Sequence, residues 1–117
     1  MAGFLEKAHK RKIERQKKLR TAALKEAQRI GRLLVSRFGA QRVILFGSLA
    51  SGECSSFGEH SDIDLAVQGL GENFYRAYGY CLRHCNFSLD IKPYEILPEK
   101  FKSEVDKKGF CIYEQIK

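Results

Sequence analysis

The sequence lacks long hydrophobic runs. None of its apolar stretches approaches the roughly 20 residues that a transmembrane helix needs. Its first residues, MAGFLEKAHKRK, also lack the apolar segment of a secretory signal peptide. The chain carries no internal repeat, and its only biased tract is a basic one near the start. We therefore expect a soluble, cytoplasmic protein with no membrane partner.

A regular cysteine pattern is missing as well. The four cysteines are Cys54, Cys81, Cys85 and Cys111, and they do not have the dense spacing of a secreted disulfide scaffold. Cys81 and Cys85, with His84 beside the second, could supply half of a zinc site. No second cysteine or histidine pair completes such a site, and two ligand-type residues four apart also arise by chance. Reduced thiols are the expectation.

Charge is present in excess, but in one segment. Residues 1–37 contain 12 Lys or Arg and 3 acidic residues, a net charge of +9, while residues 38–117 contain 9 and 11, a net charge of −2, in agreement with the total of +7. Residues 6–18 hold seven basic side chains and only two apolar ones, Ala8 and Ile13. This stretch is either a solvated helical extension or a partly disordered arm, and it could bind nucleic acid or an acidic partner.

Hydrophobic periodicity predicts a mixture of helices and strands in a single domain. Apolar residues at spacings of three and four predict a core-packing helix over 19–38 that ends near Gly39. The run RVILF, residues 42–46, predicts a buried strand, and SDIDLAV then alternates between two faces. The same patterns predict a further helix, strand, helix and strand over residues 73–85, 87–96, 97–109 and 110–116. Pro93 should interrupt the first of these two strands or force a bulge in it. This order indicates an α/β or α+β fold, with helices packed on a small mixed sheet.

Two aspartates stand one residue apart on the alternating strand. In a strand, residues i and i+2 point to the same face, so Asp62 and Asp64 lie side by side with backbones roughly 6 to 7 Å apart. Paired carboxylates repel unless a cation joins them, and Mg²⁺ is typically held by one or two carboxylates with substrate phosphates. Asp90, on the polar face of the strand over 87–96, is the candidate third carboxylate for a two-metal site.

A Gly-Ser pair ends the strand over 42–46. Gly47 allows a sharp turn and lets a phosphate approach without meeting a Cβ atom, and Ser48 adds a hydroxyl donor. Taken alone, Gly-Ser is a common turn and Asp-x-Asp can face water on an edge strand. The order strand, Gly-Ser, loop, Asp-x-Asp strand, helix and third aspartate is much more specific than either motif.

On the stretches FGSLASG, SDIDLAV and LDIKPYEI, the sequence resembles the nucleotidyltransferases of the DNA polymerase beta superfamily, and among them the minimal nucleotidyltransferase (MNT) proteins. The resemblance covers about residues 43–113. It implies a polymerase-beta-like core over 42–113, preceded by a basic extension over 1–18 and the core-packing helix over 19–38. Together these form one minimal nucleotidyltransferase domain over 1–117, with a long basic N-terminal helix.

The resemblance also implies roles for individual residues. In this family the Gly-Ser pair grips the nucleoside triphosphate, which transfers to Gly47 and Ser48. The paired aspartates bind Mg²⁺, which transfers to Asp62 and Asp64, and the third aspartate orients and activates the nucleophile, which transfers to Asp90. All three carboxylates are therefore predicted to be catalytic and metal-binding, with two Mg²⁺ ions as cofactor and ATP as substrate.

The sequence departs from the family pattern in two places. Thirteen residues, 49–61, separate Ser48 from Asp62 where the family has about ten, so the stretch CSSFGEH predicts a lengthened surface loop. Many members have an arginine in the stretch GSxARG, and Ser51 stands at that position here. Lys92 or a residue of the basic helix is the candidate replacement for this cation.

The resemblance implies transfer of AMP to a hydroxyl group. Small MNT proteins are commonly the antitoxin of HEPN/MNT pairs, in which the MNT protein adds AMP to a tyrosine of a HEPN ribonuclease toxin. We expect this protein adenylyltransferase function, with a HEPN protein encoded nearby as partner in a hetero-oligomer. The alternatives are transfer to a small-molecule hydroxyl, as in aminoglycoside-modifying enzymes, and an inactive module that binds nucleic acid or protein through the basic segment.

Overall fold

A computed structural model describes residues 2–50 and 61–114. In chain order the elements are α1 (Ala2–Phe38), β1 (Arg42–Phe46), β2 (Ile63–Gln68), the short 3₁₀ helix η1 (Gly71–Asn73), α2 (Phe74–Arg83), β3 (Leu89–Pro93), the 3₁₀ helix η2 (Tyr94–Ile96), α3 (Glu99–Lys108) and β4 (Phe110–Glu114). No helix in the described ranges is both long and apolar enough to cross a membrane. Ser51, Cys54 and the stretch 54–60 lie outside the described residues.

The four strands form one mixed sheet in the order β3-β2-β1-β4. β1 pairs antiparallel with both β2 and β4, and β2 pairs parallel with β3. The pairing of β1 with β4 shifts register between Val43 and Ile44. An α+β fold with a small mixed sheet, as predicted, is confirmed.

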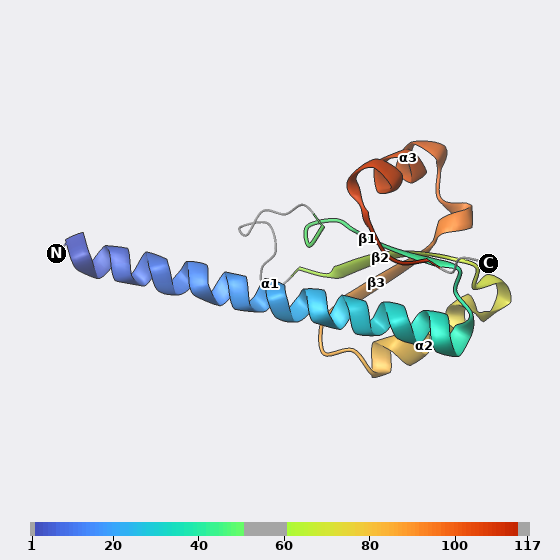
Figure 1. The fold of residues 1–117 in the computed structure, drawn as a ribbon, viewed down its shortest axis with the longest axis horizontal. Helices are drawn as coiled ribbons and strands as arrows, with labels where there is room; N and C mark the ends of the chain where they lie inside the picture. Colours follow the sequence, from blue (N-terminus) through green and yellow to red (C-terminus); the bar gives the residue numbers. More distant parts are fainter. Residues whose placement is uncertain (1, 51–60, 115–117) are drawn as a thin grey trace.

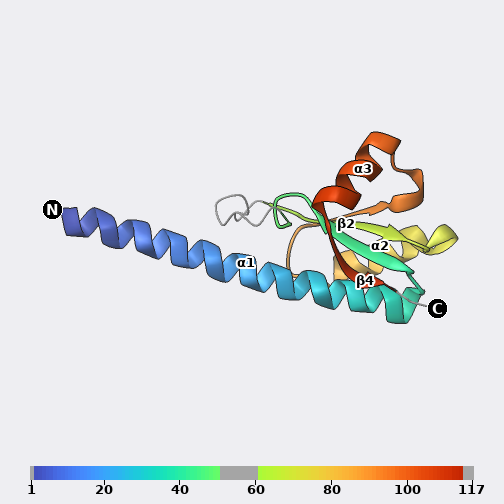
Figure 2. The ribbon, with the colours of Figure 1, turned by 45° about the horizontal axis from the view of Figure 1, so that its top comes forward.

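Helices cover both faces of the sheet, so the molecule has three layers (Figures 1 and 2). One face packs on α1 and α2 through the larger core cluster, which includes Ala27, Ile30 and Leu34 of α1 and Ala77 and Cys81 of α2. The other face packs on α3 through a small cluster of Ile44, Ala66 and Val105, with Phe46 and Phe101 against it. The alternation of β2 therefore separates two buried layers, and its only half-buried residues are Asp64 and Gln68.

α1 is one continuous helix, although only its second half packs on the sheet. Its 37 residues span about 55 Å at the usual rise of 1.5 Å per residue, which accounts for most of the longest molecular dimension, 59 Å. Figure 1 shows the N-terminal half extending beyond the body. The helix ends at Gly39, whose φ of +74° and N–H bond to the Val35 carbonyl form a left-handed cap. Of the two alternatives for residues 6–18, the helical one is confirmed.

One predicted helix is shorter than expected, because the stretch over 73–85 begins as a 3₁₀ turn and is α-helical over Phe74–Arg83. The interruption predicted at Pro93 is confirmed, since β3 ends at this residue, which has no N–H to donate, and the chain then turns into η2. The described cysteines Cys81, Cys85 and Cys111 are free thiols, as expected.

Candidate active site

The candidate site begins where β1 ends. Phe46 is the last residue of β1 and is paired with Asp64 of β2, so the next residue, Gly47, lies beside the Asp64 side chain. Gly47 has φ +75°, and a Cβ atom built there would lie 2.2 Å from Asp64 Oδ2. Gly47 is therefore required twice, for its backbone conformation and for the space that the carboxylate occupies. Its carbonyl accepts a bond from the Ala50 N–H at 3.2 Å, closing a turn that contains the half-buried Ser48.

Two of the three predicted aspartates, Asp64 and Asp90, lie on adjacent strands, whereas Asp62, predicted on the same strand as Asp64, lies just before it. Asp64 and Asp90 are register partners in the parallel pairing of β2 and β3, and both side chains are half-buried. Asp62 is exposed and directly precedes β2. A parallel neighbour strand therefore brings a residue 26 positions further along the chain beside the Asp-x-Asp motif.

This gathering of charge changes the acidity of Asp64. Burial, followed by the negative charges of Asp90 and Asp62, raises the pKa of Asp64 to about 6, while Lys92 acts in the opposite direction. A nearby cation stabilises the ionised form of such a carboxylate, because its positive charge offsets both the repulsion from the other carboxylates and the loss of hydration. The site therefore has the electrostatics of a cation-binding carboxylate cluster.

Lys92 is the cation that the chain itself supplies. It lies two residues after Asp90, on the same face of β3, and its Nζ atom is 2.9 Å from Asp90 Oδ2. This ion pair, with burial opposing it, raises the pKa of Lys92, and the charge of Asp64 contributes in the same direction. Lys92 thus remains a cation at neutral pH and stands at the edge of the carboxylate cluster.

The carboxylates are not assembled as a finished metal site. Across residues 2–50 and 61–114, no group of three or more His, Cys, Asp and Glu side chains is placed to hold a metal ion. The donor chemistry nevertheless fits Mg²⁺, because Asp62, Asp64 and Asp90 offer only hard oxygen ligands. The negative charges of Asp62 and Asp90 also act on Asp64, which a bound cation would offset. Within those same ranges, Cys81 and Cys85 belong to no such group either.

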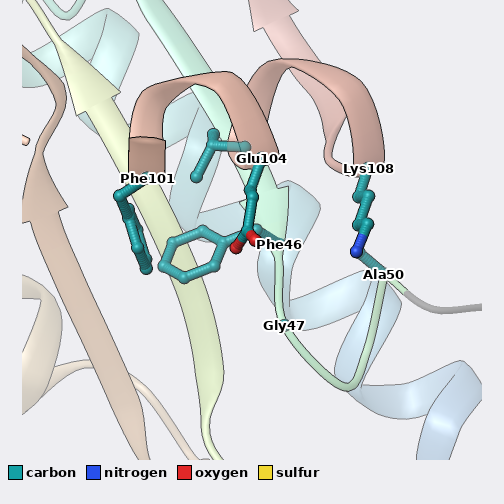
Figure 3. Close-up of a pocket in the computed structure, with 7 residues that line it drawn as sticks. Phe46, Gly47, Ala50, Phe101, Glu104 and Lys108 are labelled. Carbon is teal, nitrogen blue, oxygen red and sulfur yellow. The ribbon is translucent and has the colours of Figure 1, made fainter. Parts of the chain in front are cut away.

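A cavity of about 630 Å³ adjoins the turn after β1. It lies between this turn and α3, as Figure 3 shows, with Glu104 and Lys108 reaching from α3 toward the turn. The complete lining is Phe46, Gly47, Ala50, Phe101, Glu104, Val105 and Lys108. Its size is that of a small-molecule pocket, and Gly47 belongs both to its wall and to the contact with Asp64.

The sequence did not predict that residues of α3 would line this cavity. Phe101, Val105 and Lys108 recur at spacings of four and three, which is the signal for one helical face, but the spacing does not reveal what that face covers. Replacement of the missing arginine by Lys92 stays a prediction, and Lys92 does lie at the carboxylates.

A mixed sheet covered by helices, with carboxylates on adjacent strands beside a glycine turn, is the architecture of a nucleotidyltransferase-type domain. The chain matches the family model described as "Polymerase beta, Nucleotidyltransferase" over residues 28–117, and it belongs to this family. Among curated proteins no significant match was found.

Proposed function

We propose that the protein is a metal-dependent nucleotidyltransferase that transfers AMP from ATP to a hydroxyl of a partner protein, a HEPN ribonuclease toxin, and thereby acts as its antitoxin. The observation that carries the proposal is the contact of Gly47 with the Asp64 carboxylate, next to Asp90 on the parallel strand. A phosphate chain held at the Gly47 turn would lie beside the carboxylates that the reaction needs.

The reaction is an in-line substitution at the α-phosphorus of ATP. The acceptor hydroxyl oxygen forms a bond to phosphorus while the bond to the bridging oxygen breaks, and pyrophosphate leaves with that electron pair. The hydroxyl proton passes to a carboxylate, for which Asp90 is the candidate. Ser48 and the backbone N–H groups of the turn bind the phosphates, because Gly47 leaves the backbone accessible there.

Asp62, Asp64 and Asp90 are the residues that would hold Mg²⁺. When bound, the two ions neutralise the triphosphate charge and polarise the attacking and leaving oxygens. Lys92 takes the role of the arginine that Ser51 replaces, since its ammonium group lies at the carboxylates and is a compact positive charge that can contact a phosphate oxygen.

The acceptor is expected on a partner chain. An exposed aromatic side chain, Phe110, is 60% exposed on the edge strand β4, opposite Leu45 near the end of β1. It therefore lies at the same end of the sheet as the Gly47 turn. A partner that docks on this edge would lie at the end of the sheet that holds the Gly47 turn, with β1 between it and β2, and exposed aromatics are typical of protein interfaces.

The test is labelling of the partner. The chain is co-purified with the HEPN protein encoded beside it and incubated with Mg²⁺ and ATP labelled at the α-phosphate. Label is expected on a tyrosine of the partner, and Asp64→Asn should reduce the rate at least about 100-fold. Glu72→Gln, which removes a charge from an exposed position outside the site, should leave the rate unchanged. Absence of label with the wild-type chain would contradict the proposal.

Two alternatives remain as competing outcomes of this test. Transfer to a small-molecule hydroxyl predicts label on an added aminoglycoside instead of on the partner. An inactive binding module predicts no label on either, and it is favoured by the exposed basic side chains of the N-terminal half of α1. Such a module would bind nucleic acid with an affinity that falls steeply with salt.

A further inference from the structure

A second concave site lies between the last turn of α1 and α2. Its cavity is about 400 Å³ and is lined by Arg37, Phe38, Asn73, Arg76, Tyr80 and Arg83. Asn73, Arg76, Tyr80 and Arg83 recur at spacings of three and four, so they share one face of α2 and its N-cap, while Phe74, Ala77 and Cys81 on the adjacent face pack into the core. Apart from Phe38, which also packs against the core cluster, the lining residues lie outside that cluster.

This cavity is separate from the candidate active site. Phe38 precedes the first residue of β1, whereas Gly47 follows the last, so the two sites lie at opposite ends of that strand. Figure 1 shows α2 beside the C-terminal end of α1, on the opposite side of the sheet from α3. A ligand in the cavity would not contact the carboxylates.

Three guanidinium groups line the cavity, and among the residues that the structure describes no carboxylate does. Within the described parts of the chain, no ion pair or hydrogen bond involves the guanidinium of Arg37, Arg76 or Arg83. Two other arginines, Arg29 and Arg42, by contrast have Glu26 and Asp106 as partners. Three positive charges around one cavity repel one another. An anion in the cavity would be attracted to all three and would offset this repulsion.

Aromatic packing holds one of these cations in position. The Arg37 guanidinium carbon lies 4.6 Å from the centre of the Tyr80 ring. The Phe38 ring contacts the Tyr80 ring edge-on, with 5.6 Å between the ring centres. The centre of the His84 ring lies 4.3 Å from the centre of the Tyr80 ring. Because Arg37 and Tyr80 are fixed against each other, less conformational entropy is lost when the guanidinium binds a ligand.

We propose that this cavity, formed by Arg37, Arg76 and Arg83 around Tyr80, binds a phosphate group. Guanidinium groups match phosphate geometry with paired N–H donors, and a cavity of this volume accommodates one or two phosphates. The phosphate has two possible sources, a free phosphorylated small molecule or the backbone of a nucleic acid. This inference does not depend on the proposed transferase activity.

The test measures binding of pyrophosphate and of a short single-stranded RNA to the full chain. EDTA is present, so that no metal ion draws phosphates to the carboxylates. The double variant Arg76→Gln/Arg83→Gln should raise the pyrophosphate Kd at least about tenfold. Arg32→Gln, the matched loss of an exposed arginine outside the cavity, should change it less than about twofold. Circular dichroism confirms that the variants are folded.

The two probes identify the source. If the double variant weakens RNA binding by a similar factor, the phosphate belongs to a nucleic acid. If it weakens only pyrophosphate binding, the ligand is a free phosphorylated molecule. Failure of pyrophosphate to bind up to about 10 mM, or an equal loss in Arg32→Gln, would overturn the proposal and leave Arg37 and Arg83 as cations that stabilise the C-terminal turns of their helices.

Discussion

At the scale of single residues, Gly47 affects both the backbone conformation of the site and the position of a carboxylate in it. Its positive φ permits the turn after β1, and its missing Cβ leaves room for the Asp64 carboxylate. The two requirements can be separated experimentally, because Gly39 has nearly the same φ, +74°, with no atom within 4 Å of a built Cβ. Gly39 thus reports the conformational cost alone.

Gly47→Ala is expected to lower the free energy of unfolding by more than Gly39→Ala. The shared cost of a positive φ is about 1–3 kcal/mol, and only the Gly47 variant also displaces the Asp64 side chain. Adding Asp64→Ala should recover about 0.5–3 kcal/mol of the Gly47→Ala loss, as a double-mutant cycle in urea would measure. Additive losses would contradict the contact between Gly47 and the carboxylate.

Asp64 is expected to make stability depend on pH. Its pKa of about 6, against a usual value of 3.8, means that between these pH values the folded chain holds a proton that the unfolded chain has released. Stability should therefore fall as pH rises through this window and stay lower above it. At pH 7.5 without Mg²⁺, Asp64→Asn should be more stable than the wild type by about 1–2 kcal/mol, a value reduced for the partial exposure of the group.

Urea unfolding between pH 4 and pH 8 measures this difference. Asp62→Asn removes the same charge from an exposed position and should produce a smaller change. Parallel pH profiles for the wild type and Asp64→Asn would contradict the prediction. Added Mg²⁺ should stabilise the wild type more than the variant, since it binds the ionised carboxylate.

At the scale of elements, the two halves of α1 differ in burial. Residues such as Ala27, Ile30 and Leu34 are fully buried against the sheet. Between positions 7 and 18, by contrast, the described side chains are exposed apart from the half-buried Ile13 and Gln16. The second half of the helix therefore contributes to folding, and the first half is available for binding.

Deleting residues 2–18 should change the free energy of unfolding by less than about 0.5 kcal/mol, because the described side chains between positions 7 and 18 are nearly all exposed. Leu34→Ala should lower it by about 2–5 kcal/mol, since the substitution leaves a cavity in the core. Urea unfolding of both variants provides the comparison. A large loss on truncation would show that the N-terminal half packs on the body.

At the scale of the whole molecule, the net charge of +7 depends mainly on one projecting helix. Residues 1–18 contain 7 basic and 2 acidic residues, a net charge of +5, so the rest of the chain carries +2. Figure 2 shows this half of α1 standing clear of the sheet. A projecting helix with this positive charge would attract polyanions, and it does not cover the candidate active site.

Removal of residues 2–18 should therefore weaken non-specific binding to single-stranded RNA and make it less sensitive to salt. The slope of log affinity against log salt concentration should fall by about two to four, because up to about five net charges are lost. Fluorescence anisotropy at several salt concentrations measures this slope. An unchanged slope would exclude the arm as the main polyanion-binding surface.

Much of the architecture was predictable because it is encoded locally. The spacing of Ala27, Ile30 and Leu34 identified the packing face of α1, and Gly39 marked its end. Likewise, alternation in SDIDLAV put Asp64 on the face opposite Leu65, and Gly47 was identified from its place after a buried strand. Periods of two and 3.6 residues are properties of the backbone itself, so the sequence alone determines which side chains share a face.

Only the tertiary structure decided what those faces meet. Parallel pairing of β2 with β3 brings Asp90 beside Asp64, the contact of Gly47 with that carboxylate depends on β1 pairing antiparallel with β2, and the arginine cavity exists because α1 and α2 pack side by side. Each of these contacts joins residues distant in the chain. Local patterns do not determine strand order or helix placement, because these follow from the burial of the whole core at once.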